Sequence, residues 1–470
     1  METLSADGKH LKGIGNEEES HPLHNHRMIV AVAKFEEYAA IKHPTSYGHT
    51  LMHLTKLNIG AGIFAMGNAF KNSGLILGSI LVPLLGLICA HCVHLLVKIL
   101  TSDIFSFRLH FSLGKRVGHV KDNLNLTKNP NYAMTAEMSF AIGPSRIKNF
   151  APHMKKIVVT FLCSTQVGFC CVYVVFISRN TKQIMDYFGF EYSIQLHMVF
   201  ILFPITLCCL VRNLKYLTPL SVLANVCMLY GITITLYYSC QKPFSNVENF
   251  AHVKQLPLFF GTALYAFEGI GSELPLRNEM KNPKQFSRPF GVLNVGLTTV
   301  VVFFCLIGIS TYLHYGNAIL GSATLNLPKD ESLALSVKIV IPLGVLLTFA
   351  IQFYIPISVI FPYLRERFGP FNRPAVAECV FRVCFVLVIF ALAAIIPYLE
   401  LFISLVGALC STSIALIIPP ILELVTKSSK ITVWMIIKNV VIISMGLLGC
   451  VTGSYESIRL IIEAVKNDSS

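Results

Sequence analysis

Long apolar runs recur along the whole chain, and short polar segments separate each run from the next. A helix needs about 20 apolar residues to cross roughly 30 Å of hydrocarbon, whereas a membrane-barrel strand alternates in polarity over about ten residues. The runs are too long and too uniformly apolar for barrel strands, so they predict an all-α bundle of eleven transmembrane helices. The expected spans are His49–Phe70, Gly74–Leu100, Ile157–Ile177, Leu196–Val211, Leu217–Tyr238, Leu256–Leu276, Pro289–Tyr312, Ser336–Tyr363, Ala375–Ile396, Tyr398–Val425 and Val433–Val451.

Composition agrees with an integral membrane protein. Of the 470 residues, 54 % are hydrophobic and 13 % are charged, against roughly 25 % charged in soluble proteins. The spans leave no room for a large soluble domain. We expect a cytoplasmic tail over residues 1–48, a transmembrane domain over 49–453 that includes a cytoplasmic loop at 102–152, and a short extracellular or lumenal tail over 454–470.

Charge indicates the orientation in the membrane. A net charge of +13 would suggest nucleic-acid binding in a soluble protein. Here the basic residues gather in alternate loops: with the N-terminus in the cytoplasm, the inner loops hold 23 Lys and Arg, and the outer loops with the C-terminal tail hold nine. Because cytoplasmic loops are enriched in Lys and Arg, this split favours a cytoplasmic N-terminus. Membrane lipid is therefore the expected partner, and nucleic acid is not.

Two spans contain paired glycines near their middle, at Asn58–Gly62 in the first and Phe267–Gly271 in the sixth. Glycine costs about 1 kcal/mol relative to alanine in a helix, so each pair predicts a locally unwound segment. Such backbone must line a cavity inside the protein. Close packing of small residues is the alternative, although G-x-G is not the GxxxG spacing. Because the breaks lie five helices apart, they predict a five-plus-five inverted repeat with the site at the broken helices, as in secondary transporters.

The backbone at these breaks suits a small zwitterion. Amides at a half-helix N-terminus attract a carboxylate, and freed carbonyls attract an ammonium group. Tyr173 and Tyr354 are polar residues within other apolar runs, where ordinary interhelical hydrogen bonding is the alternative. The expected substrate-binding residues are Asn58, Gly60, Ala61, Gly62, Tyr173, Tyr265, Phe267, Gly269, Gly271 and Tyr354.

Two ionisable side chains in the spans are candidates for carrying a proton. Glu268 lies at mid-span, where an ionised carboxylate costs on the order of 2.5–3.5 kcal/mol. Its alternative role is to accept hydrogen bonds from the amides of an unwound helix. His53 lies near the start of the first span, and a histidine with a pKa of about 6.5 can exchange protons at physiological pH. Its alternative role is that of an interfacial histidine facing water.

Sequence motifs of common enzymes are missing. The chain has no P-loop, no HExxH and no G-x-S-x-G at a strand-to-helix turn. Cys89 and Cys92 are three residues apart but lie inside an apolar span, and the 14 cysteines contain no second C-x-x-C pair. We therefore expect neither an enzyme nor a metal or organic cofactor. Without a nucleotide site, any concentrative activity would need an ion gradient.

The residues around both breaks resemble a known family. His53–Gly62 is similar to the first-helix signature of the proton-coupled amino-acid transporters, and Phe259–Leu276 is similar to their sixth helix. Thr165–Tyr173, Leu325–Pro328 and Gln352–Pro356 also match. The resemblance covers roughly residues 47–455. It implies the amino acid/auxin permease branch of the amino acid–polyamine–organocation superfamily, with an eleven-helix bundle and a five-plus-five core.

This resemblance implies proton-coupled symport of amino acids without sodium, with the proton as coupling ion, and it places a histidine at His53. A plasma, lysosomal or endosomal membrane is the expected location. A sodium-coupled carrier and a non-transporting amino-acid sensor stay open as alternatives. Leu57 replaces a glycine that is common in the family, and residues 102–131 do not resemble the family. The outer loops Arg179–Ser193 and Leu313–Leu335 contain no cysteine, so an external disulfide seen in some relatives cannot form between them.

Overall fold

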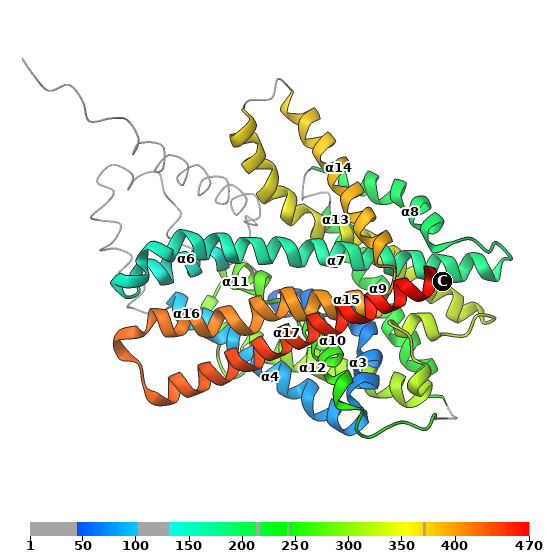
Figure 1. Ribbon diagram of the computed structural model, residues 1–470, viewed down its shortest axis with the longest axis horizontal. Helices are drawn as coiled ribbons and strands as arrows, with labels where there is room; N and C mark the ends of the chain where they lie inside the picture. The colour runs from blue at the N-terminus through cyan, green and yellow to red at the C-terminus, as the bar shows by residue number, and fades with distance from the viewer. Residues whose placement is uncertain (1–44, 102–130, 213–216, 242–243, 370–372, 470) are drawn as a thin grey trace, which may run out of the picture.

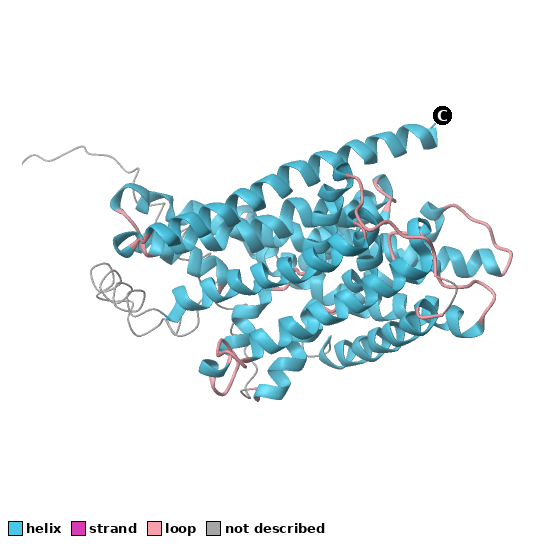
Figure 2. Cartoon of the chain, turned by 90° about the horizontal axis from the view of Figure 1, so that it is seen from below, coloured by secondary structure: helices cyan, strands magenta, loops and turns pink. Residues whose placement is uncertain are grey.

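The computed structural model describes residues 45–101, 131–212, 217–241, 244–369 and 373–469, and the expected insert at 102–131 lies almost wholly outside these ranges. Several helices, among them α7 and α17, run side by side along the long axis of the molecule, whereas α14 is inclined to it (Figures 1 and 2). The α-helices are α2 (Tyr47–Asn58), α3 (Met66–Ser73), α4 (Leu75–Thr101), α6 (Tyr132–Ile142), α7 (Ala151–Tyr187), α8 (Ile194–Cys209), α9 (Leu217–Ser239), α10 (Leu256–Ala266), α11 (Ile270–Asn278), α12 (Val292–Tyr315), α13 (Ser332–Phe368), α14 (Pro374–Ile395), α15 (Leu399–Val406), α16 (Ile418–Thr426) and α17 (Val433–Ser469).

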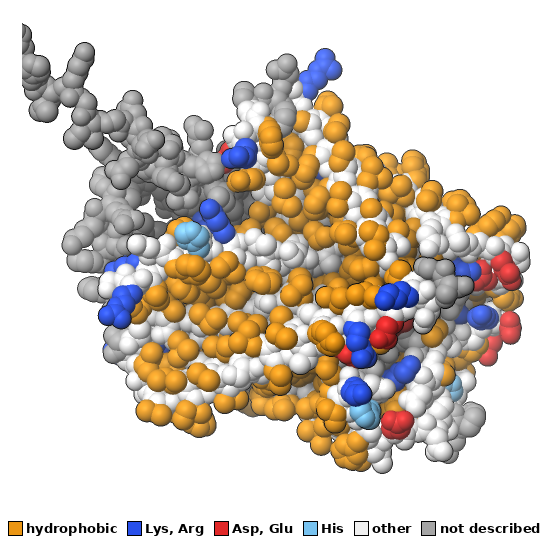
Figure 3. All heavy atoms as spheres, viewed as in Figure 1, with side chains coloured by type: hydrophobic (Ala, Val, Ile, Leu, Met, Phe, Trp, Pro, Cys, Tyr) orange, Lys and Arg blue, Asp and Glu red, His pale blue; other side chains and the backbone are white. Residues whose placement is uncertain are grey.

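Within the described ranges, eight helical stretches are long and apolar enough to cross a membrane. Apolar side chains cover the middle of the visible face, and charged side chains gather towards its ends (Figure 3). An all-helical, multi-pass membrane protein is therefore confirmed. The eight stretches are Leu75–Thr101, Ser145–Tyr187, Val222–Ser239, Val292–Ala318, Ser332–Phe368, Pro374–Ile395, Leu399–Thr426 and Val433–Asn467.

The other three expected spans are shorter or interrupted helices. The first consists of α2, the 3₁₀-helix η1 (Ala61–Ala65) and α3, and the sixth consists of α10 and α11. The fourth is α8, which has 16 residues. Both interruptions fall at the paired glycines, as the sequence predicts. Eleven crossings and the inverted repeat stay predictions.

Local sequence signals explain where several helices begin and end. The Ser46 side chain caps α2 by accepting a hydrogen bond from His49 N–H, and the Asn131 side chain caps α6 by accepting one from Met134 N–H. Gly74 separates α3 from α4 with a φ of 84°, a conformation that favours glycine. A Cβ there would also lie 2.6 Å from the Asn249 carbonyl oxygen. The sharp turn therefore requires glycine.

The two interrupted segments are packed into the middle of the bundle. α10 packs against α3, α15 and α17, while α12 packs against α2, α3 and α4. α2 and α11 are also tied at their ends, because Thr45 N–H donates to Glu279 O (2.9 Å) and Lys281 N–H donates to Thr45 O (3.0 Å). Helix α2, which precedes the first break, and helix α11, which follows the second break, are therefore also linked at a point outside the breaks.

Three features depart from the expected spans. Between α15 and α16 the tenth span winds as π-helix in η9 (Gly407–Ser411) and η10 (Ser413–Ile417). Gly407 there packs backbone-to-backbone against Gly261 of α10. The segment expected as a tail from residue 454 continues α17 to Ser469, and the expected loop at 102–152 contains α6. Hydropathy reveals neither a change of helical winding nor how far a helix continues past the apolar run.

A buried arginine joins α14 to the end of α8. Arg382 is 3 % exposed. Its guanidinium donates to Glu378 Oε1 from Nε (3.0 Å) and to the Cys209 carbonyl from Nη1 (2.8 Å). Glu378 also binds Arg212 (2.7 Å), so one carboxylate links the two helices.

Replacing this arginine tests the role of the network in stability. Arg382→Leu should lower the free energy of unfolding by about 3 kcal/mol, because breaking a buried ion pair leaves polar groups without partners. The loss of unfolding free energy is measured by thermal unfolding in detergent, with a dye that labels the buried cysteines as they become exposed. The control is Arg459→Leu, since the Arg459 side chain is 44 % exposed and its ion pairs with described residues all lie within α17. The free energy that this variant loses should stay below about 1 kcal/mol. Equal losses in both variants would contradict a structural role for the Arg382 network.

Candidate functional site

The first break lies between α2 and η1. Ile59 N–H still donates to Thr55 O (2.8 Å), but Gly60 is extended, with φ −109° and ψ −156°. Helical structure resumes at Ala61 and η1 continues directly into α3. The first amides of a helix lack partners in its preceding turn and carry the positive end of its dipole. The break therefore presents Gly60, Ala61 and Gly62 as a half-helix N-terminus.

The second break lies between α10 and α11. Phe267 N–H donates to Ala263 O (3.0 Å), and Glu268 N–H donates to Tyr265 O (3.4 Å). Helix α11 starts after Gly269, whose carbonyl accepts from Ser272 N–H (2.9 Å). The last turn of a helix leaves carbonyl groups without intrahelical partners. The end of α10 therefore presents carbonyl groups, which are hydrogen-bond acceptors, whereas the first break presents amide groups, which are donors.

The two breaks touch at two points. A Cβ on Gly62 would lie 3.0 Å from Ala266 Cα, and a Cβ on Gly269 would lie 2.7 Å from Asn58 Oδ1. The glycines therefore interrupt the helices and also allow their close approach. Local unwinding and close packing of small residues, the two interpretations of the glycine pairs, both apply. Asn58 Nδ2 donates to Leu54 O (3.0 Å). Its Oδ1 is buried and has no hydrogen-bond partner in the described part of the chain.

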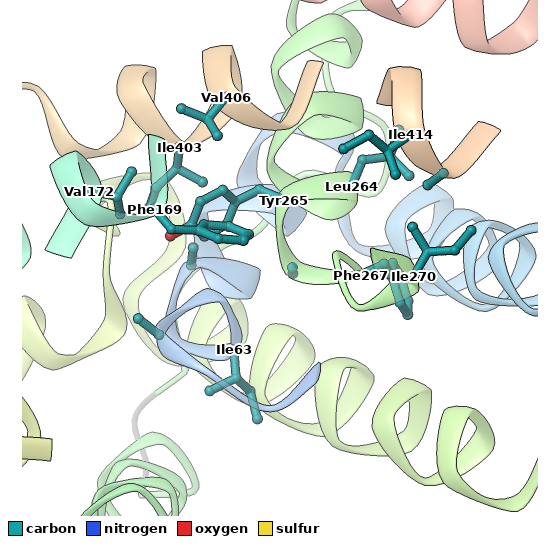
Figure 4. Packing of buried hydrophobic residues seen from close by; sticks show 14 of the residues in the cluster. Ile63, Phe169, Val172, Leu264, Tyr265, Phe267, Ile270, Ile403, Val406 and Ile414 are labelled. Atoms are coloured by element: carbon teal, nitrogen blue, oxygen red, sulfur yellow. The ribbon is translucent and has the colours of Figure 1, made fainter. Parts of the chain in front are cut away.

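Aromatic side chains from α7 and α10 border the breaks. Tyr265 packs edge-to-face on Phe169, with 4.7 Å between the ring centroids, and lies beside Ile403 and Val406 (Figure 4). The Tyr173 hydroxyl lies within interaction range of the Gln352 side chain on α13. A Cβ on Gly60 would meet only that hydroxyl, at 3.9 Å. The structure therefore brings Tyr173 and Tyr265 to the breaks and leaves space beside Gly60.

Two more of the expected residues belong to the second break but face other helices. The Phe267 ring packs on Phe304 of α12 at 5.0 Å, and a Cβ on Gly271 would lie 2.7 Å from the Leu162 side chain of α7. Their substrate-binding roles stay predictions.

His53 and Tyr354 lie away from the contact between the breaks. His53 is exposed on α2. The ring of Tyr354 lies against the Arg382 guanidinium, 5.8 Å from its carbon to the ring centroid. Tyr354 follows Gln352 by two residues, so its side chain leaves nearly the opposite face of α13. One residue in an apolar run does not reveal which face of the helix it occupies.

Two glutamates are buried at the second break. Glu268 is 8 % exposed and Glu273, in the first turn of α11, is 1 % exposed. Each has one carboxyl oxygen without a hydrogen-bond partner among the described residues. Glu273 also interacts with the Asn58 side chain across the contact. Sequence reasoning missed Glu273, although a second carboxylate five residues after Glu268 in an apolar span was the available signal.

Other buried polar atoms near the site also lack partners within the described ranges. They come from α7, α10 and η9, which pack around the breaks. Substrate or water could satisfy such groups. The atoms are Gln166 Oε1, Thr262 Oγ1, Tyr265 Oη and Ser411 Oγ. The described chain groups no three His, Cys, Asp or Glu side chains suited to a metal ion.

Comparisons with known proteins agree on one family. The family described as "Transmembrane amino acid transporter protein" matches residues 43–459. The chain is 34 % identical over 435 residues to the proton-coupled amino acid transporter-like protein pathetic of Drosophila melanogaster, covering 91 % of this chain and 88 % of that protein. It is 28 % identical over 320 residues to the probable amino acid transporter skat-1 of Caenorhabditis elegans, covering 64 % and 68 %.

The fold is similar to that of a solved transporter. The structure matches the inward-facing conformation of Mhp1 with a TM-score of 0.50 and 12 % identity, covering 91 % of this chain and 93 % of that one. The family match and the two relatives define a membrane transporter rather than an enzyme. The chain belongs to the transmembrane amino acid transporter family, the amino acid/auxin permease family, which confirms the resemblance seen in the sequence.

Substitution of Gly60 tests whether substrate occupies the space beside the first break. Gly60→Val should fold normally, because the backbone is extended and a Cβ meets only the Tyr173 hydroxyl at 3.9 Å. L-Alanine exchange in liposomes should fall by at least about tenfold, equivalent to about 1.4 kcal/mol. Gly48→Val is the matched control, since a Cβ there has nothing within 4 Å. Normal exchange by Gly60→Val would remove the reason for placing substrate there. Gly62→Val should also destabilise the fold, because it would press on Ala266.

Proposed function

We propose that this protein carries small neutral amino acids across a membrane by alternating access and that a proton moves with each one. The observation that carries the proposal is the direct contact of two helix breaks. Gly62 faces Ala266 there, and Gly269 faces Asn58. Membership of an amino acid transporter family supports an amino acid as the substrate.

Donors and acceptors at the breaks fit the two charges of a zwitterion. The substrate carboxylate would bind the amides of Gly60, Ala61 and Gly62 at the half-helix N-terminus. Its ammonium would bind carbonyls at the end of α10, near Tyr265, Ala266 and Phe267. Charge on the substrate would then be compensated by backbone dipoles.

The surroundings of the breaks favour a small, uncharged substrate side chain. The side chains next to Tyr265 are Phe169, Ile403 and Val406 (Figure 4). Apolar walls with few polar groups are typical of small-molecule sites. A charged substrate side chain would lose hydration there without gaining a partner.

Glu268 is the proposed proton carrier because it lies within the second break itself. It is buried with one unpartnered carboxyl oxygen, so a change in its charge acts directly on the contact between the breaks. The name of the Drosophila relative, a proton-coupled transporter-like protein, supports the proton over sodium. One proton per substrate, at about 100 mV and one pH unit, supplies about 3.7 kcal/mol, enough for roughly 500-fold accumulation.

The proposed topology has eleven crossings, a five-plus-five inverted repeat and a cytoplasmic N-terminus. The excess of basic residues in the expected inner loops supports this orientation. Lipid would surround the exposed apolar side chains, and a plasma, lysosomal or endosomal membrane is the proposed location.

Replacing Glu268 tests the coupling. In liposomes without sodium, an inward proton gradient should make the wild-type protein concentrate L-alanine. Glu268→Gln should keep L-alanine exchange but lose accumulation, because the amide resembles a permanently protonated acid. A structural role alone would weaken exchange and accumulation in parallel, because a charge-assisted hydrogen bond is lost.

The comparison variant is His53→Ala. If His53 carries the proton, this variant loses accumulation and Glu268→Gln retains it. Accumulation driven by a sodium gradient alone would show a sodium-coupled carrier. Binding of L-alanine without any flux would show a sensor.

A further inference from the structure

The π-helical segment of the tenth span has no role in the function proposed above, although it borders the second break. Gly407 packs backbone-to-backbone against Gly261 of α10, and Val406 lies beside Tyr265 (Figure 4). Helix α15, which leads into the segment, also packs on α10. Single π-helical turns inside longer helices are frequent at functional sites. The winding of the segment therefore determines how α15 meets the second break.

Hydrogen bonds in this segment leave one carbonyl without a donor from its own helix. Ile418 N–H donates to Ser413 O, five residues earlier, and η9 has a bond of the same spacing. An α-helix would join residues four apart. The next π-helical bond would need an N–H at position 419, but Pro419 has none. In this winding the Ile414 carbonyl therefore lacks an intrahelical partner.

Tyr132 supplies the missing donor. It is the first residue of α6 and is 1 % exposed, and its hydroxyl donates to Ile414 O (2.7 Å). Helix α6 also packs on α16, which follows the π-helical segment, and a Cβ on Gly143 would lie 2.8 Å from the Val425 side chain. A short helix between α4 and α7 in the chain thus holds the irregular part of the tenth span.

This hydrogen bond favours π-helical winding over α-helical winding. If the segment rewound as an α-helix, Ile418 N–H would donate to Ile414 O. The Tyr132 hydroxyl would then lose its acceptor, and a buried hydroxyl without a partner is costly. A bond that exists in one winding and not in the other shifts the equilibrium towards the first.

The two windings also place α15 differently. Removing one π-helical turn rotates the residues before it by about 100°, which is the step from one residue to the next. Val406 or Ala408 would then take the place of Gly407. A Cβ at this place would overlap the Gly261 carbonyl, so α15 would have to move away from α10. The side chain of Val406 would leave Tyr265.

We propose that Tyr132 is a positioning residue for substrate binding, because its hydroxyl holds the tenth span in the π-helical winding that keeps α15 against the second break. This inference rests on the proposed function and adds to it a residue that lies outside both breaks. Without the hydrogen bond the segment rewinds more often, and the wall that Ile403 and Val406 form beside Tyr265 is complete for a smaller fraction of the time. The apparent affinity for substrate falls with that fraction.

Tyr132→Phe tests the inference, because it removes only the hydroxyl. In liposomes with the purified full-length protein, the L-alanine concentration that gives half-maximal exchange should rise about fivefold, the ratio equivalent to one net hydrogen bond. The maximal exchange rate should stay near that of the wild type, because saturating L-alanine selects the π-helical winding. Without L-alanine, hydrogen–deuterium exchange of the amides in residues 407–418 should become faster. A general folding defect would instead lower the maximal rate.

Pro419→Ala, added to Tyr132→Phe, is the rescue variant. It restores a backbone N–H five residues after Ile414, so the carbonyl regains a donor in the π-helical winding. The half-maximal L-alanine concentration should return to the wild-type value. The matched control is Tyr230→Phe, which removes a hydroxyl that hydrogen-bonds Ser336 Oγ between α9 and α13 (2.6 Å). It should change neither the half-maximal concentration nor amide exchange in residues 407–418.

The outcomes separate this inference from the proposed function. An unchanged half-maximal concentration in folded Tyr132→Phe, or a rise that Pro419→Ala does not reverse, would overturn the role of Tyr132 and leave the substrate site at the breaks intact. If Tyr132→Phe does not fold, wild-type exchange by the double variant supports the inference, and failure of both variants to fold overturns it. If the wild-type protein does not exchange L-alanine, the proposed function fails. Unchanged amide exchange in residues 407–418 of Tyr132→Phe would overturn the inference in either case.

Discussion

The close contact between the two interrupted helices is the constraint on which the rest of the structure depends. Backbone groups released from a helix inside a bilayer must find partners within the protein. Gly62 against Ala266 and Gly269 against Asn58 bring the two breaks together. Helices α7, α12 and α15 then surround them, and the tenth span winds as π-helix where Gly407 meets α10. Close packing around the breaks shields these backbone groups from lipid.

Buried charged side chains of the described residues differ in how well they are partnered. Arg382 with Glu378, and Glu423 with Lys427, Lys438 and Asn439, have their charged groups hydrogen-bonded by several partners. Such networks fix helices to one another. Glu268 and Glu273 instead keep unpartnered oxygens at the second helix break, where the main chain is also irregular. The proposed function would require this difference, because a group that binds and releases a proton during the cycle must remain available in some of its states.

Hydropathy and glycine placement predicted the apolar helices and both breaks, because the cost of glycine in a helix and the length of a span are properties of a short sequence window. The tertiary details were not accessible in this way. Tyr354 lies against Arg382 because of the rotation of α13, and the burial of Glu273 depends on how α11 packs on α2 and α4. The family resemblance came largely from the residues around the breaks, because ordered motifs of this kind can be read from local sequence.

The most direct test of the account is hydrogen–deuterium exchange of the backbone amides in lipid nanodiscs, with and without saturating L-alanine. If substrate binds between the breaks, L-alanine should slow exchange in residues 59–64 and in residues 266–271 together, and leave the distant end of α17 unchanged. Protection of only one segment, or of neither, under conditions where the same protein exchanges L-alanine across the membrane, would contradict a substrate site formed by both breaks.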